Sequence, residues 1–391
     1  MKERTFCILL VAAFSATLGL GVISPFLPEF AKQHGANGFW IGMIFAGFGI
    51  SRGLIMPLVG RVSDKTGRKI FVSSGLFLFA AISQFYPHAD SVFSLTLVRM
   101  VHGLAVGLII PIVMAYTGEI AEEGKVGLRT GKLNMMFYLG LATGPFLGGF
   151  LSQNYGFDAV FHVMSVLAVI TFLMVVFFLP ESRPEEHTND VEIITFRELI
   201  RFNFIKAVLI GAASITLMMA VFLSFLPSFA DRINIDPDHI GIIISVGIFL
   251  AGMLQIPFGK ISDKHSTFGK LLQVGTGISI GMFALFVIPL CPDFTALLIS
   301  GSFLGLGAAV AAPALANLSV TIGQRVGMGA WMGIFYAATS IGFVITPLLA
   351  GIIMDHLGID AVFYLFGVFS LFGIFWVGHF VYMRHLGYKA G

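Results

Sequence analysis

The chain has 391 residues, of which 57% are hydrophobic and only 11% are charged, whereas a soluble domain carries about 25% charged residues. This composition excludes a soluble globular protein and indicates that most of the chain lies in a lipid bilayer. The formal net charge of +2 gives no sign of a nucleic-acid partner, and we expect none. In a membrane protein the sidedness of the charges is more informative than their sum.

Twelve apolar segments follow one another along the chain, and each is long enough to cross a bilayer as a helix. The first resembles a secretion signal, but its apolar run is too long and lacks a small-residue cleavage site, so we interpret it as a membrane helix. The predicted spans are 6–28, 39–59, 70–87, 93–117, 131–152, 158–180, 204–229, 239–258, 269–290, 294–317, 328–353 and 360–382.

Basic side chains distinguish the two sides of the membrane. If the N-terminus is cytoplasmic, the even-numbered connections and both tails contain most of the 23 lysines and arginines. The positive-inside rule then predicts a multi-pass protein of the cell membrane with both termini in the cytoplasm.

One long polar connection, 181–203, divides the twelve segments into six and six. The halves repeat each other: IGMIFAGFGISRGLIMPLVGRVSDK (41–65) parallels IGIIISVGIFLAGMLQIPFGKISDK (240–264). Both copies cross the membrane in the same direction, which indicates a parallel repeat. We therefore predict an all-α membrane protein of two six-helix bundles, 1–180 and 204–391, related by a pseudo-twofold axis.

The connection after the second segment, GRVSDKTGRK, is unusually charged for so apolar a chain. Gly60 and Gly67 permit a tight turn between two helices. Asp64 can face the positive N-terminal end of a neighbouring helix and accept hydrogen bonds from Arg61 or Arg68. Such a cluster can hold the two bundles together on the cytoplasmic side.

The second half contains a degenerate copy of this connection, GKISDKHSTFGK. The copy keeps Gly259, Asp263 and Lys264 but lacks the second Gly-Arg-Lys triplet. We therefore expect a second cluster that holds less strongly than the first.

Four short motifs carry a family resemblance: GRVSDKTGRK, RMVHGLAVG (99–107), GLATGPFLGG (140–149) and LPESR (179–183). They resemble signatures of the major facilitator superfamily, and the similarity covers essentially the whole chain. It implies two bundles that give alternating access to a central site, with Asp64 docked near the start of helix 11, at about 327–331. The implied cytoplasmic latch comprises Gly60, Arg61, Asp64, Gly67, Arg68, Lys69, Glu119 and Asp263.

The motif in the fifth predicted span is typical of close helix packing. Three of its glycines recur every four residues and lie on one face, where another helix can approach, and a proline bends the helix. The motif resembles that of the drug:proton antiporter branch, which implies a tight contact between the bundles and transport outwards. Its residues are Gly140, Gly144, Pro145, Gly148 and Gly149.

Two arginines lie inside predicted spans, where an arginine costs about 2.5–3.5 kcal/mol at mid-helix. Both must therefore face a polar interior, backbone carbonyls or an anion. For Arg99 the alternatives are hydrogen bonds to carbonyls of helix 1 and, by the family resemblance, a role in proton coupling. For Arg52 they are substrate-anion binding, a contact with the latch, and extension towards the cytoplasm.

Proton coupling needs a titratable group, and the predicted spans contain no carboxylate near the membrane midplane. His102 lies one helical turn from Arg99, whose charge disfavours the protonated imidazole. Glu29 follows a proline-containing segment at the outer end of helix 1. We regard these two residues as equal candidates.

The expected cavity wall, on helices 1, 4, 7 and 10, offers Met218, Phe222 and Asn317. Flexible methionine and aromatic side chains favour an adaptable apolar site. The two cysteines, Cys7 and Cys291, have no metal-ligating neighbours in the sequence and are predicted on opposite sides of the membrane, so we expect no disulfide.

Together these patterns predict a secondary transporter rather than an enzyme: a monomer that exports lipophilic or amphipathic small molecules in exchange for protons, with no cofactor and no metal. A carrier of organic anions that uses Arg52 or Arg99 is the alternative. A membrane sensor without flux is a third reading. The sequence has no phosphate-binding loop that would indicate ATP drive.

Overall fold

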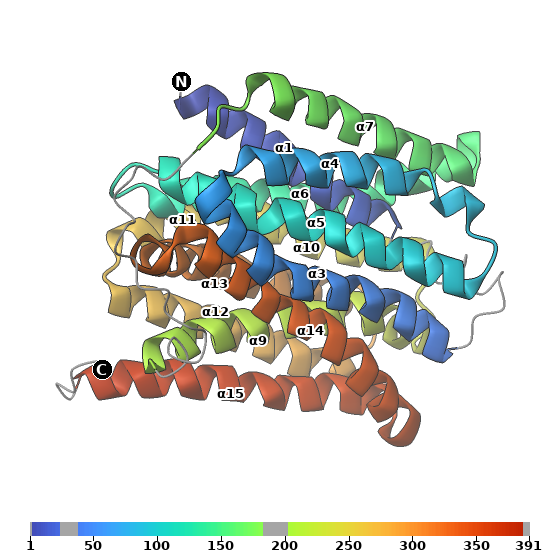
Figure 1. The fold of residues 1–391 in the computed structure, drawn as a ribbon. Helices are drawn as coiled ribbons and strands as arrows, with labels where there is room; N and C mark the ends of the chain where they lie inside the picture. Colours follow the sequence, from blue (N-terminus) through green and yellow to red (C-terminus); the bar gives the residue numbers. More distant parts are fainter. Residues whose placement is uncertain (1, 24–37, 183–201, 386–391) are drawn as a thin grey trace. The chain divides into compact units, whose positions relative to one another are not determined.

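The computed structural model describes residues 2–23, 38–182 and 202–385. The described part is helical throughout and contains 12 helices or helix pairs long and apolar enough to cross a membrane. Lipid imposes this architecture, because a helix satisfies its own backbone hydrogen bonds where water is absent. The predicted all-α membrane class is therefore confirmed (Figure 1).

The described residues of the first half form six long helices. Their bounds are α1 (Lys2–Ile23), α3 (Gly38–Thr66), α4 (Lys69–Ser83), α5 (Val92–Ile120), α6 (Val126–Tyr155) and α7 (Phe157–Phe178), with a short 3-10 turn at Tyr86–His88. The end of the first predicted span, and Glu29 with it, lies outside the described residues.

The second half repeats this order with one interruption. Its helices are α9 (Asn203–Arg232), α10 (Pro237–Met253), α11 (Gln255–Lys264), α12 (Thr267–Val287), α13 (Phe294–Val326), α14 (Met328–Leu357) and α15 (Ile359–His385), with a 3-10 turn at Ile288–Leu290. The eighth predicted span is one segment in the sequence, but the structure divides it into α10 and α11 at Leu254.

Equivalent helices pack in the same way in the two halves. In the first half α1, α4 and α7 contact one another, and in the second half their counterparts α9, α12 and α15 do the same. The direct repeat seen in the sequence is thus matched by a repeated three-helix packing (Figure 1).

The chain divides into two compact units that exchange short segments. Unit 1 comprises 1–121, 136–190 and 323–344, and unit 2 comprises the rest. The start of α14 therefore belongs to unit 1, and the start of α6 belongs to unit 2. The domain limits predicted from the sequence, 1–180 and 204–391, remain a prediction.

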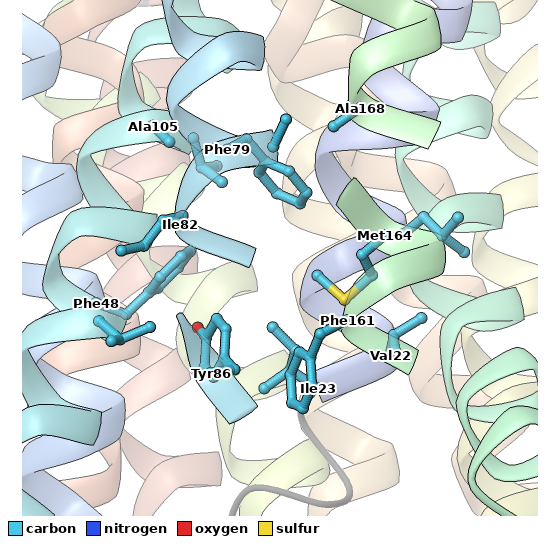
Figure 2. Close-up of a cluster of buried hydrophobic side chains, with 14 of the residues drawn as sticks. Val22, Ile23, Phe48, Phe79, Ile82, Tyr86, Ala105, Phe161, Met164 and Ala168 are labelled. Atoms are coloured by element: carbon cyan, nitrogen blue, oxygen red, sulfur yellow. The ribbon is translucent and has the colours of Figure 1, made fainter. Parts of the chain in front are cut away.

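Unit 1 has an aromatic and aliphatic core at one end of its helices (Figure 2). Tyr86 stacks on Phe161 with ring centroids 4.8 Å apart and an interplanar angle of 3°. Phe79 and Met164 fill the space beside Gly19 of α1, where a Cβ atom would collide with both side chains. Dispersion contacts of this kind hold membrane helices together, because lipid tails remove most of the hydrophobic driving force.

Candidate functional site: paired aspartate clusters and buried arginines

Asp64, near the end of α3, docks on the first turn of α14. Its two carboxylate oxygens accept hydrogen bonds from the backbone N–H groups of Gly329 (2.8 Å) and Ala330 (2.7 Å). These amides have no partner within their own helix and lie at its positive end. Gly327, with φ of +100°, allows the chain to turn into the helix directly beside the carboxylate.

Arg68 joins Asp64 to α5. Its Nη2 donates to Asp64 (2.6 Å) and Glu119 (2.5 Å), and its Nη1 donates to Ser63 (2.5 Å). Burial of the guanidinium lowers its pKa, but the carboxylates of Glu119 and Asp64 outweigh that effect and raise the pKa above the usual range. Arg68 is therefore a permanent cation. We call Asp64, Arg68 and Glu119, with Gly329 and Ala330, the first aspartate cluster.

The two glycines of this motif have different tasks, and the prediction that both form a turn is wrong for Gly60. Gly60 lies inside α3, where a Cβ atom would collide with the backbone carbonyl of Gly329, so its small size permits α14 to approach. Gly67 does form the turn, with φ of +100°. Arg61 is exposed and makes no hydrogen bond that the structure records among the described residues.

The LPESR segment attaches to the same cluster. Glu181 Oε1 accepts hydrogen bonds from the backbone N–H groups of Arg68 (2.6 Å) and Lys69 (3.1 Å), at the start of α4. Ser182 donates to Glu119 Oε2 (2.7 Å), and Tyr116 donates to the carbonyl of Pro180. The residues that begin the long connection are thus part of the cluster's hydrogen-bond network, a contact that the sequence analysis missed.

Unit 2 contains a counterpart of this arrangement. The carboxylate of Asp263, in α11, accepts hydrogen bonds from the backbone N–H groups of Gly127 (2.6 Å) and Leu128 (2.8 Å), in the first turn of α6. A Cβ atom on Gly259 would collide with the carbonyl of Gly127, as one on Gly60 would with Gly329. The degenerate copy therefore retains the same docking geometry.

The two clusters differ in their charged partners. Asp263 accepts a third hydrogen bond from Asn317 Nδ2 (3.0 Å), whose Oδ1 accepts from Lys270 Nζ (2.7 Å). Asp263 lacks the direct arginine bond that Asp64 has, since the structure records no ion pair for it among the described residues. We call Asp263, Asn317 and Lys270, with Gly127 and Leu128, the second aspartate cluster.

This location corrects the expectation for Asn317, which the sequence analysis assigned to a cavity wall. Its side chain is buried and fully engaged between Asp263 and Lys270. Met218 and Phe222, assigned to the same wall, are also buried and fill space beside Gly281 and Gly301 of α12 and α13. Helix numbering alone cannot tell which face of a helix packs inward.

The RMVHGLAVG motif brings α3 against α5. Cβ atoms on Gly103 and Gly107 would collide with Phe48, Ser51 and Ile55 of α3, so these glycines admit the other helix. Ser51 Oγ also donates to the carbonyl of Met100 (2.7 Å). The motif thus fixes the face of α5 that carries Arg99.

Arg99 is 1% exposed, and its guanidinium lies 4.6 Å from the ring centroid of Phe48. Its Nε and Nη1 have no hydrogen-bond partner among the described residues. One of the two alternatives for Arg99 is a set of hydrogen bonds to backbone carbonyls of the first helix. Its Nε and Nη1 atoms make no such bond to the described residues of α1. The contact is a cation–π interaction, which stabilises a buried guanidinium only in part.

His102 lies beside Arg99 in the same buried region. Its Nδ1 is 2.9 Å from the hydroxyl of Tyr86, and its Nε2 is buried without a partner among the described residues. The rings of Phe48 and Phe79 meet the imidazole edge-on. An imidazole held in this way has one ring nitrogen free.

Arg52, the other arginine inside a predicted span, is 6% exposed, with an Nε that has no partner among the described residues. It does not extend to the aqueous surface, so extension towards the cytoplasm is not what the structure shows. Its guanidinium lies 5.9 Å from the ring centroid of Phe343 in α14, and its backbone lies beside Gly107 of α5.

Glycines of the 140–149 motif, in α6, contact α1. Cβ atoms on Gly140 and Gly144 would collide with backbone atoms of Phe14, Gly21 and Val22. The close contact at these positions is thus within the first half, and the expectation of a contact between bundles is not met there. Pro145 lies inside the continuous helix α6, and Gly149 has nothing within 4 Å of a Cβ position.

Within the described residues, twelve membrane-length helical segments in a direct repeat, and two aspartates each docked on a helix start, define a polytopic membrane protein. The sequence matches the description "Major Facilitator Superfamily" over residues 9–291 and 208–386. The chain belongs to the Major Facilitator Superfamily, whose members are secondary transporters and not enzymes.

Several relatives are similar to this chain over nearly their whole length. Multidrug resistance protein 2 of Bacillus subtilis is 30% identical over 368 residues, which cover 90% of each chain. The quinolone resistance protein NorA of Staphylococcus aureus is 26% identical over 372 residues, 93% of each chain. An uncharacterized MFS-type transporter of Methanocaldococcus jannaschii is 26% identical over 91% of this chain and 93% of its own.

A solved structure has the same fold. The human organic anion transporter MFSD10 (TETRAN) superposes with a TM-score of 0.82 over 96% of this chain and 99% of its own, at 17% identity. This similarity confirms the fold and carries no information on substrate.

Proposed function

We propose that this chain is a proton-driven exporter of lipophilic or amphipathic small molecules that works by alternating access. The observation that carries the proposal is the similarity, over 90% or more of both chains, to two bacterial proteins named for quinolone and multidrug resistance. The resemblance of the 140–149 motif to the exporter branch supports the outward direction.

The two aspartate clusters supply the conformational latch. The starts of α14 and α6 belong to units 1 and 2 respectively, and each helix continues into the other unit. A relative movement of the units must therefore carry the docked helix start along or break its hydrogen bonds to Asp64 or Asp263. Two charge-assisted bonds per aspartate, each about 1.5–3 kcal/mol, are enough to bias such an equilibrium strongly.

His102 and Glu29 are the proposed coupling residues. His102 has a free ring nitrogen in a buried site next to Arg99. Protonation there would place two positive charges one helical turn apart, so any rearrangement that separates them or supplies an anion would be linked to proton binding.

The test is proton movement on substrate addition in proteoliposomes that contain the full chain. We expect His102→Gln or Glu29→Gln to abolish accumulation against a gradient and to leave downhill exchange intact. His162→Gln is the matched control, because His162 is exposed on α7 and its recorded hydrogen bond among the described residues is to Gln84. If both single variants and the double variant still couple, the proton uses another site or the driving ion is not a proton.

A carrier of organic anions is the second candidate. Neither Arg52 nor Arg99 has an acidic partner among the described residues. A screen of cationic, neutral and anionic compounds for transport separates the two candidates, since an anion carrier would accept only the last group.

A further inference from the structure

Arg52 lies where α3 meets α14. It is eight residues before Gly60, which places it about 12 Å along the helix from that glycine. On either side of it, Gly49 would meet Val344 and Gly53 would meet Ser340 if they carried Cβ atoms. The two helices are therefore in contact above and below the guanidinium, which is held at their junction within unit 1.

The guanidinium has no acidic partner in the described part of the chain. Arg52 makes no recorded hydrogen bond or ion pair there, and its buried Nε is unpartnered. A buried charge of this kind is stable only when it is paired and hydrogen-bonded. Water does not hydrate the charge either, because the residue is only 6% exposed.

The neighbours of Arg52 are aromatic and in part hydroxylated. The ring centroid of Phe343 is 5.9 Å from the guanidinium carbon. Tyr336, on α14, lies near Arg52 and also near Tyr138 of α6. Tyr336, Tyr138 and Phe343 are all partly exposed, whereas Arg52 itself is buried.

Arg99 provides an instructive contrast. It is 1% exposed and stacked on Phe48, and both Phe48 and Tyr86 beside it are themselves buried. Of the two described rings that face Arg99, Phe48 is buried and Phe45 is partly exposed. The three aromatic side chains near Arg52, by contrast, are all partly exposed.

We propose that Arg52, Tyr336, Tyr138 and Phe343 form a subsite for the carboxylate and adjoining aromatic ring of a transported molecule. The guanidinium fork matches a planar carboxylate with two parallel hydrogen bonds. A phenol hydroxyl adds a further donor, and the aromatic rings offer a stacking surface. The inference rests on the proposed function in that it names the class of substrate: an amphipathic aromatic molecule with a single negative charge.

The test compares two fluorescent probes that differ only in charge, dansylglycine and dansylglycinamide, on the purified full chain. We expect the wild-type protein to bind the carboxylate at least about tenfold more tightly than the amide, as one charge-assisted pair supplies. Arg52→Gln should reduce this preference to about onefold and leave the Kd of the amide within about twofold. Arg232→Gln is the matched control, because Arg232 pairs with Asp360 at an exposed position.

Two further variants keep the test decisive if Arg52→Gln does not fold. Arg52→Lys retains the charge without the fork and should keep only part of the preference. Tyr336→Phe retains the ring without the hydroxyl and should lower the preference while the amide binds as before. The proposal is overturned if the wild-type protein shows no preference, or if all three variants keep it in full.

The same preparation separates this inference from the proposed function. Proton-driven export of a neutral dye, without a carboxylate preference, would refute the subsite alone. A carboxylate preference that depends on Arg52, without proton-driven flux of any probe, would support the subsite and refute the exporter.

Discussion

The carboxylate of Asp64 spans two successive backbone amides of α14, with Oδ1 2.8 Å from Gly329 N. Asp64 lies in α3 and Gly329 lies in α14, so the two residues are on different helices and far apart in the sequence. The bond therefore reports directly on whether the start of α14 is seated against α3.

Asp64→Asn should reduce proton-driven flux about tenfold or more while leaving insertion intact. Asparagine has nearly the same volume, but it offers one acceptor oxygen and turns an NH2 group towards a donor, so the charge-assisted bonds of about 1.5–3 kcal/mol are lost. Flux in proteoliposomes measures the effect, together with maleimide labelling of cysteines introduced on the cytoplasmic side, which should increase. Normal flux with unchanged labelling would leave Asp64 with only a topological role.

Asp263→Asn should have a smaller effect than Asp64→Asn in the same assays. Both aspartates dock on two backbone amides, but Asp263 lacks the direct arginine pairing of the first cluster. An equal or larger loss of flux would show that backbone docking, and not the arginine, determines the strength of a cluster.

Arg68→Lys should impair transport nearly as much as Arg68→Ala. The guanidinium reaches Asp64, Glu119 and Ser63 at once, which a single ammonium group cannot do. Because the carboxylates raise its pKa, the stabilisation by its charge is present below its unfolded-state value and is lost only as the pH rises through the folded value. Arg68 itself should therefore cause no change in flux between about pH 6 and 9. Full flux in the lysine variant would contradict this account.

Gly144→Ala should destabilise the protein by about 1–3 kcal/mol, because the new methyl group would overpack against the backbone of α1. Gly149→Ala, five residues later in the same helix, is the control, since nothing lies within 4 Å of its Cβ position. It should be neutral or stabilising by up to about 1 kcal/mol. Thermal unfolding in detergent measures both, and equal shifts would rule out a specific contact with α1.

Cys291 should react slowly with maleimide at neutral pH. Burial and the nearby Asp293 raise the pKa of its thiol to about 11, so only about one thiol in a thousand is ionised at pH 8. The labelling rate of a Cys7→Ser variant should rise about tenfold per pH unit up to that value. A rate already at its plateau at pH 8 would show that the thiol is not shielded.

The sequence by itself determined the class of fold. The composition, the twelve apolar segments and the direct repeat follow from one physical demand, that a backbone in lipid must satisfy its own hydrogen bonds. Each segment must meet this requirement by itself, so the membrane helices can be predicted from the sequence without knowledge of how they pack. The break at Leu254 escaped notice because the predicted span continues through it to Phe258.

The docking partners needed the tertiary structure. The spacing of Gly60 and Asp64 indicated that something docks there, yet only the folded chain shows that Gly60 is a contact point on a helix and that Gly67 alone forms the turn. The placement of Asn317 in the second cluster likewise depends on which face of α13 meets α11.

The residues that surround Arg52 and Arg99 were also determined by the tertiary structure. The sequence identified Arg52 and Arg99 as costly charges in lipid, because their cost depends only on depth. The aromatic rings that lie beside each arginine come from other helices, and whether an acidic group lies near it depends on those helices as well. For Arg52 the neighbouring ring belongs to Phe343 of α14. Side-chain neighbours of this kind result from packing between helices, and periodicity within one helix does not encode them.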